Sequence, residues 1–332
     1  MTVVDVEPVE PVAKRRRRRL GSVELLAALV VVGLLGRGVL LGLFDSPRAQ
    51  TLVTVFVSVM VQALPFLVLG TVLSAAITAF VPTRFFERAL PRQAAAAVPV
   101  AGLAGAVLPA CECGSVPVAG ALMRRGVAPA AAFAFLLASP AINPVVLVST
   151  AVAFPGQPKM VLARFVASLL TASVMGWLWL RLGRPGWLRP VRVTDSHTER
   201  GWAAFWTSCR HDVVQAGGFL VIGAFAAATL SVTVPPRWLE TVAANPVLSV
   251  LALAVLAVLL SICSEADAFV AASLSQFSLT ARLAFLVVGP MVDLKLFAMQ
   301  VGSFGSRFAV RFAPTTFVAA IGVAVVVGTV LL

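Results

Sequence analysis

The motif Cys111-Glu112-Cys113-Gly114 puts two thiols and a carboxyl group within three consecutive residues, in the middle of an apolar run over residues 94–124. Thiols at positions i and i+2 of an unwound turn can converge on one soft ion or electrophile, because thiolates prefer Cu(I), Zn(II) and comparable thiophilic centres. The carboxyl group is costly in such a setting, since an acid at the centre of a membrane costs about 3 kcal/mol on insertion scales. The carboxyl group of Glu112 is therefore expected to have an ion-pair partner, to face a cavity or to have a functional role.

A third thiol, Cys263, stands near a second acid, Glu265, in the C-terminal half of the chain. Together with Cys111 and Cys113 it gives three candidate ligands for a thiophilic substrate or a metal ion. The alternative for each thiol is that it is a small buried hydrophobic side chain. The four cysteines of the chain are too few for a disulfide scaffold.

Glu112 and Glu265 form a pair of acids, one in each half of the chain. If both face one cavity, their mutual repulsion favours a state in which one of them holds a proton at neutral pH, as a proton-coupled antiporter needs. Asp267 lies close enough in sequence to join them. The alternative is a structural role, in which each carboxyl group bonds neighbouring backbone or hydroxyl groups.

Two further groups interrupt apolar segments. Asp293 and Lys295 are most simply an internal ion pair, because a lone lysine at that depth would be costly. A role in ion coupling is the alternative. The segment 139–144, which includes Pro140 and Asn143, is expected to break its helix and leave carbonyl groups free. These carbonyls could coordinate an ion, or the break could merely form a kink.

The composition indicates which elements position these groups. The chain has 332 residues, of which 60% are hydrophobic and 12% charged, and its mean hydropathy is +0.98, which excludes an ordinary soluble domain. Lysine and arginine outnumber acids by 26 to 14, but most arginines lie between apolar segments and so report membrane orientation. We expect a lipid bilayer and a small solute or ion as partners, with no nucleic acid and no nucleotide or other cofactor.

Residues 1–20 end in six consecutive cations at 14–19 and are predicted to be a disordered basic N-terminus. Residues 21–44 are apolar over a greater length than the 7–15 residues of a signal-peptide core. We therefore expect a retained N-terminal transmembrane helix with the basic block in the cytoplasm. A signal peptide is the alternative.

Two series of four apolar segments follow. With a shift of 153 positions, residues 62–87 match residues 215–240 at 11 of 26 positions without a gap, which apolar composition alone rarely gives. The same shift lays Glu112 on Glu265. The first series covers about 51–80, 95–123, 128–154 and 160–181, and the second covers 213–233, 246–277, 280–301 and 308–332.

The arginines indicate how each series crosses the membrane. If all four segments crossed, the arginine-rich connector at 183–212 would lie outside, against the positive-inside rule. If 95–123 instead enters and returns on the same side, as two half-helices meeting near Cys111–Gly114, every arginine cluster is cytoplasmic. The repeat predicts a second such hairpin at 246–277, although its tip has no glycine or proline. Three crossings and one re-entrant hairpin make an odd number, so the two units are inverted, as in secondary transporters.

The stretches Leu-Pro-Ala-Cys-Glu-Cys-Gly-Ser-Val-Pro-Val at 108–118 and Phe-Leu-Leu-Ala-Ser-Pro-Ala-Ile-Asn-Pro at 135–144 resemble the bacterial predicted permeases of the YraQ and ArsP type. The resemblance extends from about residue 50 to the C-terminus. It implies an inner-membrane permease, and in the ArsP branch the activity is efflux of trivalent methylated and aromatic arsenicals. Three groups of site residues follow from it: Cys111, Glu112, Cys113 and Gly114; Pro140 and Asn143; and Glu265 to Asp267.

We therefore expect an all-α polytopic membrane protein, with inverted repeats at 50–182 and 213–332 joined by a cytoplasmic connector at 183–212 and preceded by one extra N-terminal span. The N-terminus is expected in the cytoplasm and the C-terminus outside the inner membrane.

The expected function is secondary-active efflux of a small thiophilic solute, a trivalent organoarsenical or a soft metal species, and not an enzymatic reaction. One alternative is a thiol oxidoreductase that passes electrons between the cysteines, and another is a membrane subunit of a metal-handling complex. The candidates for substrate binding are Cys111, Cys113, Gly114, Cys263, Asn143 and Pro140; those for proton coupling are Glu112, Glu265, Asp267, Asp293 and Lys295; and those for a metal are Cys111, Cys113 and Cys263.

Overall fold

The computed structural model describes residues 47–82, 85, 90–91, 93–107, 111–189, 201–233 and 245–332, and residues Thr51–Leu332 form one compact unit. Every regular element of the described residues is helical. The expected disordered N-terminus at 1–20 and the expected N-terminal span at 21–44 lie outside the described residues.

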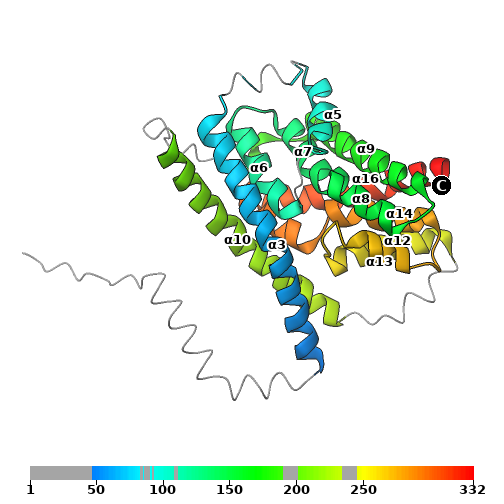
Figure 1. The fold of residues 1–332 in the computed structure, drawn as a ribbon. Helices are drawn as coiled ribbons and strands as arrows, with labels where there is room; N and C mark the ends of the chain where they lie inside the picture. The colour runs from blue at the N-terminus through cyan, green and yellow to red at the C-terminus, as the bar shows by residue number, and fades with distance from the viewer. Residues whose placement is uncertain are drawn as a thin grey trace, which may run out of the picture. The chain divides into compact units, whose positions relative to one another are not determined.

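The helices fall into two series in the same order (Figure 1). Each series has one long helix, two short helices, two helices in direct succession and a final long helix. The first series comprises α3 (Pro47–Phe80), α5 (Ala94–Ala104), α6 (Glu112–Arg124), α7 (Pro129–Ile142), α8 (Pro144–Ala153) and α9 (Pro158–Leu182). The second comprises α10 (Trp202–Thr233), α12 (Pro246–Leu260), α13 (Asp267–Ser273), α14 (Leu279–Met291), α15 (Leu294–Phe304) and α16 (Ser306–Leu331), and a 3-10 turn, η1 (Pro185–Trp187), follows α9.

Six segments of the described residues are long and apolar enough to cross a membrane, which confirms a multi-pass membrane protein. Four of them are single long helices, and the other two are the successive pairs α7–α8 and α14–α15. The helices α5 and α12 are apolar but shorter. The six segments are Ala49–Phe80, Pro129–Ala153, Pro158–Leu182, Trp202–Thr229, Leu279–Phe304 and Ser306–Leu331.

The two series pack alike. In the first series α5 and α9 both pack on α7, and in the second α12 and α16 both pack on α14. Each series also sends one short helix to the other: α6 packs on α15, and α13 packs on α8. These short helices bring each broken span into contact with the other series, and the two series also pack directly through α9 on α16 and α7 on α14.

The breaks arise from local chemistry. Between α7 and α8, Asn143 is extended, and its side-chain oxygen accepts a hydrogen bond from the backbone N–H of Val146 at 3.0 Å, so it caps α8. Asp293 caps α15 in the same way. Between α12 and α13, Ser261 has φ 46°, a left-handed conformation that ends α12 without a glycine. The predicted break at 139–144 is thus confirmed.

Two boundaries differ from the sequence-based expectation. The first short-helix pair is interrupted before Cys111, so that Gly114 lies inside α6 and not at the tip of the turn. The predicted connector at 183–212 is partly helical, because α10 already begins at Trp202. The reason is packing: Phe205, on the apolar side of this stretch, packs against α3 despite the polar residues around it.

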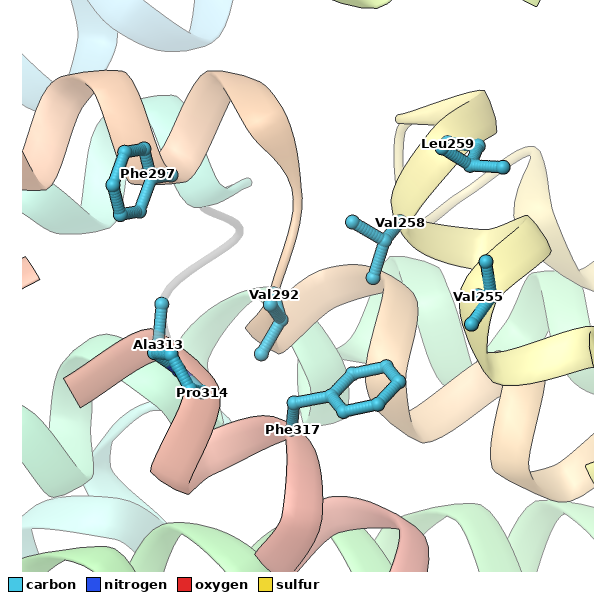
Figure 2. Close-up of a pocket in the computed structure, with 8 residues that line it drawn as sticks. All are labelled: Val255, Val258, Leu259, Val292, Phe297, Ala313, Pro314 and Phe317. Atoms are coloured by element: carbon cyan, nitrogen blue, oxygen red, sulfur yellow. The ribbon is translucent and has the colours of Figure 1, made fainter. Parts of the chain in front are cut away.

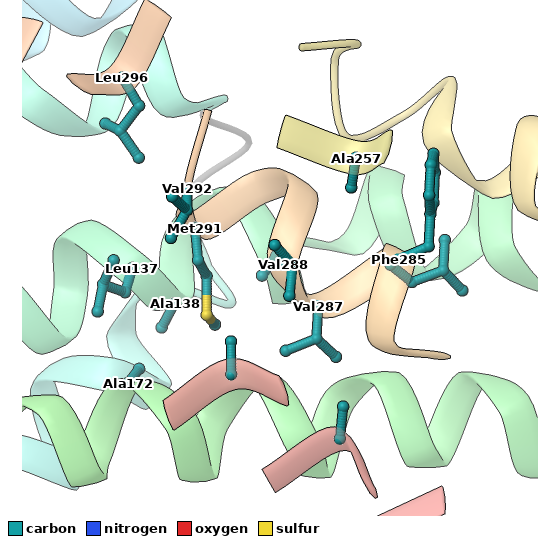
Figure 3. Close-up of a cluster of buried hydrophobic side chains, with 14 of the residues drawn as sticks. Leu137, Ala138, Ala172, Ala257, Phe285, Val287, Val288, Met291, Val292 and Leu296 are labelled. Atoms are coloured by element: carbon teal, nitrogen blue, oxygen red, sulfur yellow. The ribbon is translucent and has the colours of Figure 1, made fainter. Parts of the chain in front are cut away.

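The helices α7 and α14 lie in the interior. Nearly every residue of α7 is buried, and so is α14 from Leu283 to Met291. Figure 3 shows Leu137 of α7, Ala172 of α9 and Met291 of α14 in one cluster of buried side chains. Many members of the cluster are alanines, which let helix backbones approach closely, and close packing is what holds helices together inside a membrane.

Candidate functional site

The thiol motif lies at the buried start of α6. Cys111 is the N-cap residue of this helix, and Cys111 and Cys113 are both fully buried. Their thiols lie within electrostatic reach of each other. All four cysteines are free thiols in this structure.

Glu112 is held by a residue from the other half of the chain. The ammonium nitrogen of Lys295 lies 2.8 Å from Oε1 of Glu112 and 3.3 Å from Oδ2 of Asp293. These three side chains are at most 2% exposed. The predicted pair of Asp293 and Lys295 is confirmed, and the structure adds Glu112 as its third member. One buried cation is thus paired with two buried acids.

Close helix packing brings Lys295 into this position. A Cβ atom on Gly223 of α10 would lie 2.6 Å from the Cα atom of Lys295, and one on Gly70 of α3 would lie 2.3 Å from the Cα atom of Gly114. Only glycine permits such contacts between backbones. Two corresponding glycines, one on each long first helix, therefore set the positions of the helix starts that carry Glu112 and Lys295.

A second buried ion pair also joins the halves. The Arg164 side chain on α9 is fully buried, and its Nη2 atom donates to Oδ2 of Asp267 at 2.9 Å and to the carbonyl oxygen of Ser264 at 3.3 Å. Its Nη1 atom donates to the hydroxyl of Thr150 at 2.8 Å. Sequence reasoning missed this arginine as a site residue. The signal was present, because a cation in the middle of an apolar span needs a partner.

In the second series, Asp267 occupies the structural position that Glu112 occupies in the first. Each is the first residue of a short helix, and each is paired with a cation from the other half. Glu265, which the sequence shift aligns with Glu112, is half-buried and forms no ion pair with any described residue. It lies within electrostatic reach of both Arg164 and Lys295.

The remaining candidates lie around these groups. Cys263 is 2% exposed and lies within electrostatic reach of Cys111, Glu112 and Lys295. Asn143 uses its side chain locally, since besides capping α8 it donates from Nδ2 to the carbonyl oxygen of Ser139 at 3.2 Å. Pro140 lies inside α7, where it is fully buried near the break.

The three thiols do not form a ready metal site in this conformation. Among the described residues, no three His, Cys, Asp or Glu side chains are grouped so that they could hold a metal ion. A metal site shared by Cys111, Cys113 and Cys263 therefore stays a prediction.

Several buried polar atoms of the site have no partner, which marks places for water or a ligand. Oε2 of Glu112 and the hydroxyl of Ser139 are two of them. The others in the described residues are Nε of Arg164, Oδ1 of Asp267, the hydroxyls of Ser168 and Ser264, and Oε1 of Gln300.

An apolar pocket of about 320 Å³ lies beside the two breaks of the second series (Figure 2). Figure 2 shows Val292, which directly precedes Asp293, between Phe297 of α15 and Phe317 of α16. On the α12 side the wall is formed by Val258 and its neighbours, just before the turn that leads to Cys263. The pocket thus adjoins the backbone of the polar site but contains none of its side chains.

A third ion pair between the halves is less deeply buried. Nη2 of Arg124, at the end of α6, lies 3.3 Å from Oδ2 of Asp212 on α10. The hydroxyl of Ser74 on α3 donates to the same carboxylate oxygen at 2.6 Å. This contact joins α3, α6 and α10, so α6 is tied to the second half at both of its ends.

The comparisons with known proteins agree on one family. A family model described as predicted permease matches residues 48–329. A Streptococcus mutans protein named as a two-component membrane permease complex subunit is 30% identical over 282 residues, which are 82% of this chain and 94% of that protein. The Bacillus subtilis UPF0718 protein YcgR is 36% identical over 268 residues, which are 77% of this chain and 89% of that protein. No solved structure matches the chain.

Proposed function

The chain belongs to the ArsP-like predicted permease family, and from this premise we propose that it is a secondary transporter that exports a small thiophilic solute across the inner membrane. One observation carries the proposal: Lys295 of the second half binds Glu112, which stands between the thiols of Cys111 and Cys113. A polar site built by both halves inside an apolar protein is where secondary transporters bind their solutes.

In this proposal the two halves are inverted units of three spans and one re-entrant hairpin. The pair α5–α6 is the first hairpin, and the pair α12–α13 is the second. Their lengths support this assignment, because helices of 11, 13, 15 and 7 residues are shorter than the ~20 residues of a full crossing. The matched packing of the two series supports it as well. The N-terminus is then cytoplasmic and the C-terminus outside, in accord with the positive-inside rule.

The chemistry of the site suggests a division of roles. Cys111, Cys113 and Cys263 bind the thiophilic atom, which is the arsenic of a trivalent organoarsenical or a soft metal species. The acids carry the counter-transported proton, and Lys295 balances their charge. The acids are Glu112, Glu265, Asp267 and Asp293, while Gly114, Pro140 and Asn143 shape the helix starts beside them.

Export from a sensitive host tests the thiol role. We expect the variant Cys111→Ser/Cys113→Ser to lose resistance to a trivalent organoarsenical and to lose its transport into inverted vesicles, because a serine hydroxyl is a poor ligand for a soft centre. Cys209→Ser is the matched control. Cys209 is also buried, but it lies on α10 and packs against α3, away from the other three thiols in sequence. Export by the double variant at the wild-type rate would show that the thiols do not bind the solute.

A second candidate function follows from the Streptococcus mutans relative, whose name places it in a two-component permease complex. In this alternative the chain needs a second subunit before it transports anything. The purified chain alone in vesicles would then be inactive, and a stable partner would co-purify from the native membrane. Transport by the chain alone would exclude this alternative.

A further inference from the structure

The surroundings of Arg164 contain four buried polar atoms that have no partner among the described residues. The guanidinium group binds Asp267, Ser264 and Thr150 through its two terminal nitrogens, but its Nε has no partner. The other carboxylate oxygen of Asp267, the hydroxyl of Ser264 and the hydroxyl of Ser168 are also unpaired. All four residues are at most 3% exposed.

One of these four atoms belongs to the guanidinium group of Arg164, and the other three belong to residues that contact Arg164 or share its helix face. Nη2 of Arg164 donates to one carboxylate oxygen of Asp267 and to the backbone carbonyl oxygen of Ser264, so both residues are held against the guanidinium group. Ser168 follows Arg164 by four residues on α9, which puts the two side chains on one face of the helix. The unpaired atoms thus come from α9 of the first half, and from the α12–α13 turn and the first residue of α13 in the second half.

The donors and acceptors of this group define the chemistry of its occupant. Nε of Arg164 can only donate, the free oxygen of Asp267 accepts, and the two serine hydroxyls do both. A bare anion would be repelled by Asp267, and a bare cation by Arg164. A hydroxyl group fits, because its oxygen accepts from Nε while its hydrogen is donated to the carboxylate. Filling the site also relieves unpaired buried groups, which are unfavourable.

We propose that Arg164, Asp267, Ser168 and Ser264 form a subsite that binds a hydroxyl group, supplied either by water or by the transported solute. Ser264 directly follows Cys263, so a solute held by that thiol can place a hydroxyl in the subsite. If the hydroxyl comes from the solute, the inference rests on the proposed transport of thiophilic solutes. It adds that solutes carrying a hydroxyl on the thiophilic atom are preferred.

Calorimetric titration of the purified full-length protein in detergent tests the inference with two probes. Arsenous acid has three hydroxyls, and each thiol that forms an As–S bond gives its proton to one hydroxyl, which leaves as water. The subsite requires that only two of the three candidate thiols, Cys263 and either Cys111 or Cys113, bind the arsenic at once, which leaves one hydroxyl on it; a third As–S bond would remove that hydroxyl. Methylmercury hydroxide also binds a thiol, whose proton leaves with the hydroxide as water, so the bound methylmercury carries no hydroxyl. We expect Ser168→Ala/Ser264→Ala to weaken arsenous acid binding about tenfold, the effect of one or two lost hydrogen bonds, and to leave methylmercury binding unchanged.

The matched control is Thr171→Val. Thr171 is equally buried on α9, but its hydroxyl is already bonded to the carbonyl oxygen of Ala167 within the helix. This variant should bind both probes as the wild type does.

The outcomes separate the two sources of the hydroxyl. A loss for arsenous acid alone supports a solute hydroxyl. Unchanged binding of both probes with a lower midpoint of thermal unfolding supports water, because the variant has lost bonds to that water. Unchanged binding with an equal or higher midpoint overturns the subsite, since removing unpaired buried hydroxyls is then neutral or stabilising. An equal loss for both probes also overturns it. If the wild type binds neither probe, the thiophilic proposal itself fails, and only the unfolding midpoint decides whether the subsite holds water.

Discussion

At the scale of single residues, the site depends on buried charges that compensate one another. Lys295 is fully buried and serves both Glu112 and Asp293. A buried pair is not by itself a gain in stability, because removing two charges from water costs as much as their attraction returns. Removing only one partner is different, since the charge that remains is buried without compensation. A costly cluster of this kind inside a membrane points to function.

The substitution Lys295→Met tests this balance. It leaves two buried acids without a cation, so we expect a loss of about 3–5 kcal/mol in the free energy of unfolding, measured by denaturant unfolding in detergent. The triple variant that adds Glu112→Gln and Asp293→Asn should recover most of this loss, because no uncompensated charge remains. Lys159→Met, at an exposed position, is the control and should change little. Equal stability of the single variant and the wild type would show that the ion pair is not buried.

At the scale of elements, the short helices that begin inside the protein are the parts that place the chemistry. The helix α6 starts at Glu112 and α13 at Asp267, and each packs on a broken span of the other series. The long helices α3 and α10 hold the starts of α6 and α15 through direct backbone contact at Gly70 and Gly223. A displacement of these contacts would move Glu112 relative to Lys295.

Gly70→Ala should therefore destabilise the protein and impair transport together. Its Cβ atom would lie 2.3 Å from the Cα atom of Gly114, and backbone atoms cannot move aside as a flexible side chain can. Overpacking of this kind costs about 1–3 kcal/mol, measured as the change in unfolding free energy.

Gly218→Ala on α10 is the matched control for Gly70→Ala. A Cβ atom there has open space around it, and alanine favours the helix by up to about 1 kcal/mol. If Gly70→Ala is as stable as Gly218→Ala, the two helices are not in backbone contact.

At the scale of the whole molecule, the proposed orientation of the chain rests on its charges and on the number of spans in each series. Six described segments can cross the membrane, three in each series. In the proposed topology each series crosses the membrane three times, and this odd number would invert the second series relative to the first, the arrangement that lets one central site open alternately to the two sides. The exposed turn after α9 carries Arg184 and Arg189 and is expected in the cytoplasm.

Single cysteines in two exposed turns test this orientation. Gln157→Cys, between α8 and α9, should react with a membrane-impermeant maleimide added to intact cells, and Gly186→Cys, after α9, should react only once the membrane is permeabilised. The wild type provides the background, because its four cysteines are buried. The opposite pattern would invert the proposed topology, and labelling of both positions from outside would exclude it.

The sequence by itself determined the features that depend on local patterns. Apolar segments of sufficient length identified a multi-pass membrane protein, the repeated series was visible as a shift of 153 positions, and the break at Asn143 followed from its flanking prolines. The pairing of Asp293 with Lys295 was also predictable, because the two residues are two positions apart and a buried lysine requires an acid. The family was evident from the two motif stretches around Cys111 and Asn143.

Only the tertiary structure decided which distant residues meet. Glu112 and Lys295 are 183 positions apart, and Arg164 and Asp267 are 103 apart. Their pairing depends on which helix N-termini pack against each other. No local sequence pattern encodes this packing. For the same reason the sequence shift aligned Glu112 with Glu265, whereas the helix starts bring Asp267 into the corresponding place. Hydropathy requires a partner for every buried charge, but helix packing selects the partner.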